Sequence, residues 1–378
     1  MVSLTPLRHT PLRHAPLASI RRRARSPLAV LEALATPHGL DRYLELVNPM
    51  LTVRELRAEV TGVRRTAGPS VTLTLRPTRQ WRGFAAGQFV TIAVDIDGVR
   101  RSRCYSPACS EHRADGQLEL TVKAHPDGVV SNWLYANATP GLVVGLSQAD
   151  GVFALPTPRP ERVLLISGGS GVTPVMSMLR TLVDEGHAGE IVFLHYGNTE
   201  ADVAYLPELR AIAAAHANVR LVLGYTAQAA GGDLHGLFDE THLADAAPWY
   251  AEAPAYLCGP PPLMAAVRDQ YAAKGIEDLL HTEEFLAAPL AVPDADATGA
   301  VRFGDTLVEN NGATLLEQAE DAGLSPAYGC RMGICFSCTQ VKKSGCTKNV
   351  LTGDVHTDPD TEIQLCISVP VGDVDIDL

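Results

Sequence analysis

The sequence predicts a multidomain protein: an antiparallel β-barrel, an α/β domain with a parallel sheet, and a smaller domain that contains most of the cysteines. Three observations predict this architecture. Short alternating strand patterns dominate residues 51–158, and strand patterns alternate with helical patterns over residues 159–286. Five of the eight cysteines lie after residue 299. At 378 residues, the chain is long enough for two or three domains.

Composition and charge exclude several classes of protein. An apolar content of 46% is sufficient for conventional buried cores and excludes a globally disordered chain. A formal net charge of −12 argues against a nucleic-acid-binding protein, which usually presents a basic surface. No apolar run reaches the length that spans a bilayer, so we expect a cytoplasmic protein. Eight cysteines are too few for a disulfide scaffold, and their clustering suggests metal ligation in a reducing compartment.

Residues 1–50 are interpreted as a basic leader and a short helical extension. They contain seven arginines against three acids, and include the stretches "TPLRHTPLRHAPL" and "RRRAR". A secretory signal needs an apolar stretch, but "PLAVLEALA" is too short and contains Glu32. Two interpretations of the leader remain open: a disordered tail, and an arm that contacts a membrane surface or an acidic partner.

The predicted elements then follow in three blocks. In residues 51–158, "SVTLTLRP", "GQFVTIAVDIDG" and "LELTVKA" alternate β-forming and polar residues, which indicates strands of an antiparallel barrel. In residues 159–286, "RVLLISG", "IVFLHYG", "VRLVLGY" and "AYLCGP" are buried strand patterns separated by helical patterns, which indicates a parallel sheet. Residues 287–298 are rich in Ala, Pro and Asp and form a predicted linker. In residues 299–378, Thr314 and Glu317 predict a capping box that opens a helix.

The segment "GCRMGICFSC" contains three cysteines with the spacing C-x4-C-x2-C, and a fourth candidate follows after 27 residues. Four thiolates can bind zinc, a [4Fe–4S] cluster or a [2Fe–2S] cluster. Structural zinc usually has two paired C-x2–4-C units, and the bacterial [4Fe–4S] run is C-x2-C-x2-C. The spacing observed here is that of a plant-type [2Fe–2S] cluster, with the predicted ligands Cys330, Cys335, Cys338 and Cys366. Cys346 competes for the fourth place, but it lies in the polar turn "KKSGCTKN".

Residues 299–378 resemble a plant-type ferredoxin. The family pattern C-R-x-G-x-C-x-x-C…C matches Cys330, Arg331, Gly333, Cys335, Cys338 and Cys366. The resemblance implies a β-grasp fold with an acidic surface. In agreement with that surface, these residues include twelve acids and five bases, a net charge of −7.

A [2Fe–2S] cluster accepts one electron, so a hydride donor needs a flavin as an intermediate carrier. "RCYSPACS" (103–110) offers an arginine for phosphate, an aromatic ring for stacking and hydroxyls for hydrogen bonds. R-x-Y-S is a weak motif alone, and a barrel strand with a hydrogen-bonded tyrosine is the alternative. "PDGVVSNWL" (126–134) places Gly128 and Ser131 at the start of a predicted helix, where main-chain amides favour an anion.

Two further segments indicate a nucleotide site. "ISGGSGVTPVMSMLR" (166–180) is a glycine-rich turn between a strand and a helix, and its glycines allow a diphosphate to approach the helix N-terminus. It is neither a G-x-G-x-x-G fingerprint nor a Walker loop. "YLCGPPPLM" (256–264) places Cys258 at the carboxyl edge of the predicted sheet, where ligands bind, although a single such cysteine is more often a buried thiol.

Taken together and in this order, the segments over residues 51–288 resemble the ferredoxin–NAD(P)⁺ reductase superfamily. The resemblance implies that the catalytic residues are Ser106, Cys258, Glu283 and Phe285, with Ser106 near the reactive N5 edge of the flavin and Cys258 beside the hydride-donating carbon. It implies that the flavin contacts Arg103, Cys104, Tyr105 and Ser106, and that its diphosphate contacts Gly128, Val129, Val130 and Ser131. The implied nucleotide site comprises Gly168, Gly169, Gly171, Thr173, Pro174, Cys258, Gly259 and Pro260. "YSPACS" is closer to the FAD-binding than to the FMN-binding members.

The implied function is a reductase that passes electrons from NAD(P)H through FAD and [2Fe–2S] to an external oxygenase or fatty acyl desaturase. "DRYLELVNPMLTVRELRAEV" with "RCYSPA" most resembles the reductase partners of membrane acyl-CoA desaturases, which would bring the protein to the membrane surface as a peripheral partner. Rieske dioxygenases, alkane or steroid hydroxylases and cytochromes P450 remain alternative acceptors. A redox sensor is an alternative of a different class, and it would not sustain NAD(P)H oxidation with ferricyanide.

The sequence also predicts a preference for NADH over NADPH. The 2′-phosphate of NADPH is usually bound by Arg or Lys. The stretches 198–202 and 226–230, which follow the second and third predicted strands of the α/β domain, contain no base, and Glu200 and Asp202 would repel a phosphate. Arg210, on the following helix, is the nearest arginine.

Overall fold

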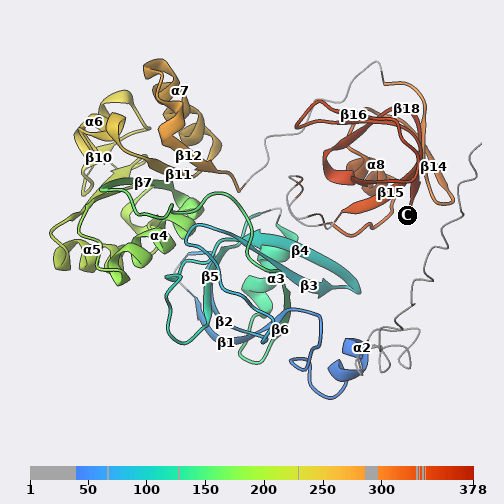
Figure 1. The fold of residues 1–378 in the computed structure, drawn as a ribbon, viewed down its shortest axis with the longest axis horizontal. Helices are drawn as coiled ribbons and strands as arrows, with labels where there is room; N and C mark the ends of the chain where they lie inside the picture. Colours follow the sequence, from blue (N-terminus) through green and yellow to red (C-terminus); the bar gives the residue numbers. More distant parts are fainter. Residues whose placement is uncertain are drawn as a thin grey trace, which may run out of the picture.

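Three sheets make up the part of the chain that the computed structural model describes (Figure 1). The described residues are 40–65, 68–126, 128–228, 230–285, 297–328, 331, 333, 336 and 338–378. Most of the basic leader, most of the predicted linker, and the predicted ligands Cys330 and Cys335 lie outside them. Among the described residues, no helix combines the length and the apolarity that crossing a bilayer requires.

The first sheet forms the barrel, and its strands pair antiparallel in the order β4-β3-β6-β1-β2-β5, which confirms the prediction. Alternate residues point inward, so Val60, Leu73, Ile92 and Leu120 share one core. β4 and β5 are the edges of this sheet, and helix α3 packs against both. The elements are α2 (Leu40–Glu45), β1 (Arg57–Arg65), β2 (Ser70–Pro77), β3 (Val90–Ile96), β4 (Val99–Tyr105), β5 (Leu118–Lys123), α3 (Val129–Asn137) and β6 (Val143–Leu146).

The second sheet is parallel throughout, in the order β10-β9-β8-β7-β11-β12, and forms the predicted α/β domain. Helices α4 and α5 pack on one face and α6 and α7 on the other, so the central strands are continuously apolar. The elements are β7 (Arg162–Gly168), α4 (Val172–Asp184), β8 (Glu190–Gly197), α5 (Leu206–Ala215), β9 (Val219–Tyr225), β10 (Leu234–His235), α6 (Glu240–Ala246), β11 (Ala255–Cys258), α7 (Pro261–Lys274) and β12 (Leu280–Glu283).

The third sheet belongs to the carboxy-terminal domain (299–378), where helix α8 packs against a mixed sheet in the order β14-β13-β18-β15-β16, with β17 paired to β15. The capping box predicted at the start of α8 is confirmed, since Glu317 N donates to Thr314 Oγ1 and Thr314 N donates to Glu317. The elements are β13 (Ala300–Phe303), β14 (Thr306–Glu309), α8 (Leu315–Asp321), β15 (Thr339–Asn349), β16 (Val355–His356), β17 (Thr361–Gln364) and β18 (Ser368–Asp377).

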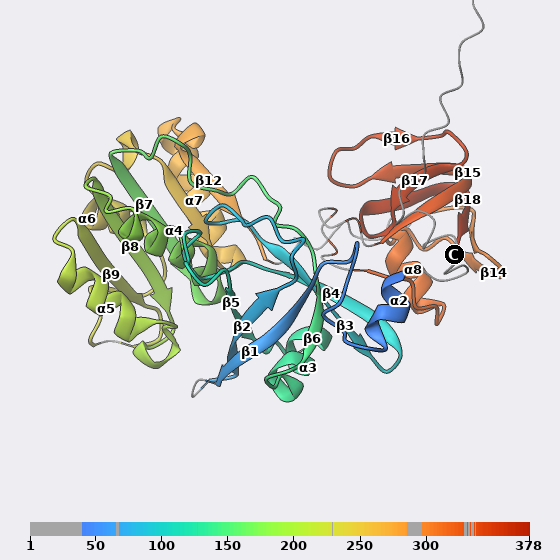
Figure 2. The same cartoon turned by 60° about the horizontal axis from the view of Figure 1, so that its bottom comes forward.

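The barrel lies between the other two domains in both views (Figures 1 and 2). The α/β domain meets β5, where the side chain of Thr121 hydrogen-bonds to the hydroxyl of Tyr205. The carboxy-terminal domain meets β4, where Ser102 Oγ donates to the main-chain oxygen of Tyr328 at 3.1 Å. Thr121 on one edge strand thus contacts the α/β domain, and Ser102 on the other edge strand contacts the carboxy-terminal domain.

Candidate active site where the domains meet

Three predicted site residues meet where the barrel adjoins the α/β domain. Ser106 directly follows β4, and its Oγ donates a hydrogen bond to Oε2 of Glu283 at 3.2 Å. Glu283 ends β12 and is the register partner of Cys258, the last residue of β11. The carboxyl ends of parallel strands share one sheet edge, which is where ligands bind in such folds. Ser106, Cys258 and Glu283 therefore lie in one site, although they are far apart in the sequence.

Burial governs the electrostatics of this site. Burial raises the pKa of Glu283 from 4.5 to about 8, and the hydrogen bond from Ser106 offsets part of that rise. Burial, together with the charges of Glu283 and Glu284, raises the pKa of the Cys258 thiol well above its ordinary value. Cys258 is therefore an uncharged thiol at neutral pH, and Glu283 can hold a proton there. The site can keep a proton at this edge without placing a fixed negative charge beside a bound ring.

Strand β4 presents the predicted flavin-binding residues. Tyr105 ends the strand, and its buried hydroxyl has no hydrogen-bond partner among the described residues. An unsatisfied buried hydroxyl costs about 1–3 kcal/mol, so this position fits a hydroxyl that contacts a bound flavin. Cys104 Sγ lies 3.6 Å from Oγ1 of Thr91. Arg103, which the resemblance assigns to flavin binding, donates to the main-chain oxygen of Ser102 at 2.8 Å.

Gly128 is the N-cap of helix α3, and among the described residues no side-chain cap bonds to the first amides of the helix. A Cβ at Gly128 would lie 2.2 Å from Oγ of Ser131, so a larger residue there would displace this hydroxyl. Ser131 Oγ accepts from the main-chain amide of His125 at 3.3 Å and donates to the oxygen of Gly128 at 3.2 Å. Val129 is exposed beside this turn, and Val130 is buried in the barrel core. Uncapped amides at a helix N-terminus fit a diphosphate.

Two loops of the α/β domain pack together without an intervening side chain. A Cβ at Gly171 would lie 2.1 Å from the main-chain oxygen of Cys258, and one at Gly168 would lie 2.8 Å from Cδ of Pro260. Gly169 has a φ of +53°, in the left-handed region that favours glycine. The glycine-rich turn and the C-G-P segment therefore form one surface at the sheet edge, and this surface fits a nucleotide diphosphate.

The other predicted nucleotide residues surround that surface. Thr173 and Pro174 are buried in the first turn of α4, and Thr173 Oγ1 donates to the oxygen of Ser170 at 3.3 Å. Gly259 directly follows Cys258, and a Cβ there would lie 3.0 Å from a methyl of Leu263. The side chain of Phe285 is partly buried and packs against the core of the α/β domain.

The structure brings two of the four predicted cluster ligands to adjacent segments. Cys338 and Cys366 are both buried in the core of the carboxy-terminal domain. The main-chain amide of Leu365 donates to the oxygen of Cys338 at 3.1 Å, which holds the two segments together. Cys346 lies farther along β15, eight residues beyond Cys338, a span of roughly 25 Å in an extended strand. This placement favours Cys366 over Cys346 as the fourth ligand.

Sequence reasoning missed the residues that hold the domains against one another. Arg180 of α4 donates to the main-chain oxygen of Ala108 at 2.7 Å and to Glu119 at 2.8 Å, across the interface with the barrel. Arg101 of β4 lies over the ring of Tyr328, 4.8 Å from its centroid. No local pattern marks these contacts. The sequence gives one weak signal: Arg101 stands two residues before the R-x-Y-S motif, and Tyr328 stands two residues before the cysteine pattern.

Three family models match successive parts of the chain. An oxidoreductase FAD-binding domain matches residues 69–154, an oxidoreductase NAD-binding domain matches residues 165–269, and a 2Fe-2S iron-sulfur cluster binding domain matches residues 302–371. These matches fall on the barrel, the α/β domain and the carboxy-terminal domain. They confirm the predicted cofactors FAD, NAD(P)H and [2Fe–2S].

Individual proteins resemble the chain over most of its length. A NADPH oxidoreductase of Mycobacterium tuberculosis is 37% identical, and the alignment covers 91% of this chain and 90% of the relative. The ferredoxin reductase component of 3-ketosteroid-9-alpha-monooxygenase from the same species is 32% identical over 79% of this chain and 85% of its own. The solved structure of phthalate dioxygenase reductase has a TM-score of 0.54 and 23% identity, and the match covers 86% of this chain and 98% of its own. This last likeness shows the three-domain fold alone.

Proposed function

The chain belongs to the ferredoxin reductase superfamily of oxidoreductases that carry a carboxy-terminal 2Fe-2S domain, and on that premise we propose that its electron acceptor is an external oxygenase or fatty acyl desaturase. One observation carries the proposal. Strand β4 and the residue that follows it contact Glu283 of the α/β domain and Tyr328 of the carboxy-terminal domain. A single strand therefore adjoins both the electron entry site and the segment that leads to the cluster.

Several residues of the chain would position the nicotinamide and the flavin for the transfer between them. When bound, the flavin takes two electrons from NAD(P)H and releases them singly, and the cluster carries one electron at a time. We assign Tyr105 to contact with the flavin ring, and the Ser106–Glu283 hydrogen bond to holding a proton beside it. Cys258, at the edge of the sheet, would border the nicotinamide. The close approach of Gly171 to Cys258 leaves no room there for a side chain.

The carboxy-terminal domain offers a surface for the acceptor beside the cluster loop. Phe336, within that loop, is 65% exposed and Leu351 is 57% exposed, although both are large apolar residues. Leu351 Cδ1 lies 3.2 Å from the position that a Cβ at Gly333 would occupy, so it borders the same loop. The domain around this patch is acidic. These features support an acceptor that presents an apolar contact with a basic rim.

The identity of the acceptor separates two proposals. The oxygenase proposal is supported by the relative that is named as the ferredoxin reductase component of a 3-ketosteroid-9-alpha-monooxygenase. The desaturase proposal, with peripheral contact at the membrane through residues 1–50, is supported by the resemblance of residues 41–60 and 103–108 to desaturase reductases. That segment includes α2, whose Asp41 accepts hydrogen bonds from the amides of Val53 and Arg54.

Reconstitution tests these proposals. The holoprotein is mixed with membranes that contain an acyl-CoA desaturase, or with a soluble oxygenase component, and NAD(P)H-driven product formation is measured. Leu351→Ser is expected to slow coupled turnover about tenfold at low acceptor concentration without slowing ferricyanide reduction, because buried apolar contacts dominate docking. Leu307→Ser is the matched control, since Leu307 is 59% exposed on β14. Turnover with the oxygenase alone would reject the desaturase, and turnover with neither would reject both.

A further inference from the structure

Tyr328 carries an unusual concentration of positive charge around its ring. The guanidinium carbons of Arg331, Arg101 and Arg103 lie 4.1, 4.8 and 5.0 Å from the ring centroid. Arginine groups within about 6 Å of an aromatic centroid are attracted by the ring quadrupole. Although burial alone would raise the pKa of Tyr328, the hydrogen bond with Arg331 and the nearby arginine charges lower it on balance. Two of the three arginines belong to the barrel, so the ring joins two domains.

Tyr328 contacts β4 through both its main chain and its ring. Its main-chain oxygen accepts from Ser102 Oγ at 3.1 Å, while its ring meets Arg101 and Arg103, which flank Ser102 in the strand. Side chains alternate between the two faces of a strand, so the contacts with Ser102 and with the arginines fall on opposite faces. Tyr105 follows Arg103 by two residues and shares its face. The ring of Tyr328 is therefore bound on the face of β4 that leads to the predicted flavin position.

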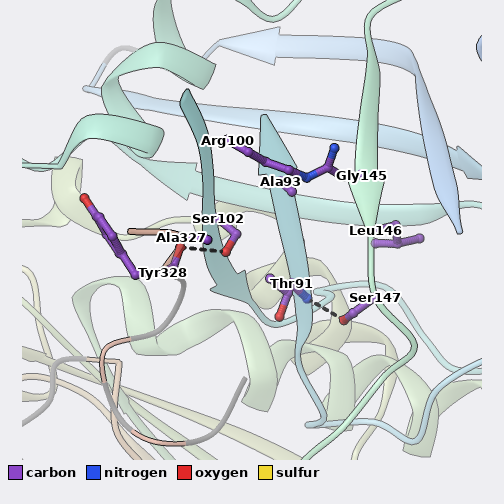
Figure 3. Close-up of a pocket in the computed structure, with 9 residues that line it drawn as sticks. All are labelled: Thr91, Ala93, Arg100, Ser102, Gly145, Leu146, Ser147, Ala327 and Tyr328. Atoms are coloured by element: carbon purple, nitrogen blue, oxygen red, sulfur yellow. Dashed lines mark hydrogen bonds between the residues drawn. The ribbon is translucent and has the colours of Figure 1, made fainter. Parts of the chain in front are cut away.

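A pocket adjoins this contact. Ser102, Ala327 and Tyr328 line a pocket of about 320 Å³ together with residues of β3 and β6 (Figure 3). This volume holds several water molecules. Figure 3 shows the ring of Tyr328 turned away from the pocket while its main chain borders it. Among the described residues, the aromatic contact therefore lies beside this pocket.

The third arginine ties the ring to its own domain. Arg331 pairs with Glu320 of α8 at 2.5 Å, so its position over the ring is fixed from the carboxy-terminal side. In the sequence, Tyr328 and Arg331 bracket Cys330, a predicted cluster ligand. A movement of the ring relative to β4 would therefore move the segment that leads into the cluster loop.

We propose that Tyr328 is a positioning residue for electron transfer from flavin to cluster: its ring, bound by Arg101 and Arg103, docks the carboxy-terminal domain on β4 as a latch. The inference rests on the proposed function only in that electrons leave through the cluster. Each NAD(P)H oxidised yields NAD(P)⁺, one proton and two electrons, and the cluster passes the two electrons singly. The latch sets the rate of that internal step and is independent of the identity of the acceptor.

The test uses the full-length holoprotein without an external acceptor. Stopped-flow absorbance after mixing with NADH separates flavin reduction from cluster reduction, and small-angle X-ray scattering reports domain separation. Tyr328→Leu and Arg101→Gln should slow cluster reduction about tenfold and increase the radius of gyration, while flavin reduction stays unchanged. Tyr328→Phe keeps the aromatic face and should behave as wild type. Arg76→Gln, which removes an exposed arginine of β2 on the same barrel, is the matched control.

Two results would overturn the latch. One is cluster reduction at the wild-type rate in both Tyr328→Leu and Arg101→Gln. The other is slower reduction with an unchanged scattering profile, which would assign the effect to the electronic path rather than to docking. Because Tyr328 is buried and its replacement could unfold the domain, Arg101→Gln with full cluster absorbance is the decisive variant. Loss of acceptor turnover alone, with internal transfer intact, would count against the proposed function and not against the latch.

Discussion

The barrel is joined to its two neighbours by interfaces of different kinds. Toward the α/β domain, Arg180 donates to the main-chain oxygen of Ala108 and pairs with Glu119, and Ser177 donates to the oxygen of Cys109 at 2.7 Å. At the margin of this interface, a guanidinium nitrogen of Arg159 lies 2.6 Å from both Glu111 and Glu185. Toward the carboxy-terminal domain, by contrast, the contacts of the described residues centre on the ring of Tyr328, beside a pocket.

The difference follows from what crosses each interface. Hydride transfer needs the reacting atoms about 3–3.5 Å apart, so the domains that bind the nucleotide and the flavin must be held in fixed register. A single electron can pass without contact between the reacting atoms, so the cluster can be held by a contact that breaks and re-forms. A dense polar network suits the first requirement, and a small aromatic latch suits the second.

Replacing a cluster ligand should have the largest effect, because it removes the cofactor of the carboxy-terminal domain. Cys366→Ser is expected to abolish the [2Fe–2S] absorbance and the EPR signal of the reduced cluster, because Cys366 and Cys338 lie on segments held together at 3.1 Å. Cys346→Ser should leave both signals intact, since Cys346 lies well along β15. Ferricyanide reduction should continue in both variants. Retention of the cluster in Cys366→Ser, with its loss in Cys346→Ser, would reverse the ligand assignment.

Weakening the interface between the barrel and the α/β domain should have the next largest effect, on both stability and flavin reduction. Arg180→Gln leaves the partly buried Glu119 without its cation, so we expect the free energy of unfolding to fall by about 3–5 kcal/mol. Reduction of the flavin by NADH should slow about a hundredfold, because a small displacement of the reacting atoms is costly. Chemical denaturation and stopped-flow absorbance measure the two effects. The exposed Arg162, as Arg162→Gln, is the control, and equal flavin reduction rates in the two variants would refute the role of Arg180.

The pH dependence of the unfolding free energy tests Glu283, which is buried at the same interface. The folded-state pKa of Glu283 is about 8 against an ordinary 4.5, so the folded protein keeps a proton that the unfolded chain releases. Stability is therefore expected to fall as pH rises through this interval, by at most about 1.4 kcal/mol per pH unit. Thermal unfolding of the flavin-free protein between pH 5 and 8 measures the slope. Glu283→Gln should flatten it, and an unchanged slope would contradict the assignment.

Nucleotide preference should show the smallest effect. Arg210 Nη1 pairs with Glu200 Oε1 at 2.8 Å, beside the end of β8, so in the wild type its charge is engaged by a carboxylate. We expect a higher kcat/KM for NADH than for NADPH, and a gain of a few-fold for NADPH in Glu200→Gln, where Arg210 is released toward a phosphate. A wild-type preference for NADPH, in line with the name of the Mycobacterium tuberculosis relative, would reject this prediction.

The sequence predicted the elements better than the contacts between them. Alternating and continuous apolar patterns indicated the barrel and the parallel sheet, because strand burial on one face or two leaves a local signature. The capping box at Thr314 was likewise predictable from four residues. The Ser106–Glu283 hydrogen bond spans 177 positions, and only the family resemblance brought the two residues together.

The sequence did not predict the latch at Tyr328 or the polar contacts that join the barrel to the α/β domain. Ser102 and Tyr328 are 226 residues apart, and their contact depends on how two separate sheets meet. Arg103 also lies over the ring of Tyr328, and no sequence motif predicted this contact between two domains.

The position of β4 at the edge of its sheet has a consequence for solubility. An uncovered edge strand offers unpaired main-chain groups to other chains and promotes aggregation, and charged side chains suppress this. Tyr328 and its neighbours cover β4 only while the latch is closed. Arg100, Arg101 and Arg103 place three positive charges on this seven-residue strand, so two uncovered copies repel each other. We expect these arginines to disfavour pairing of β4 with a second copy of the chain when the contact with Tyr328 is broken.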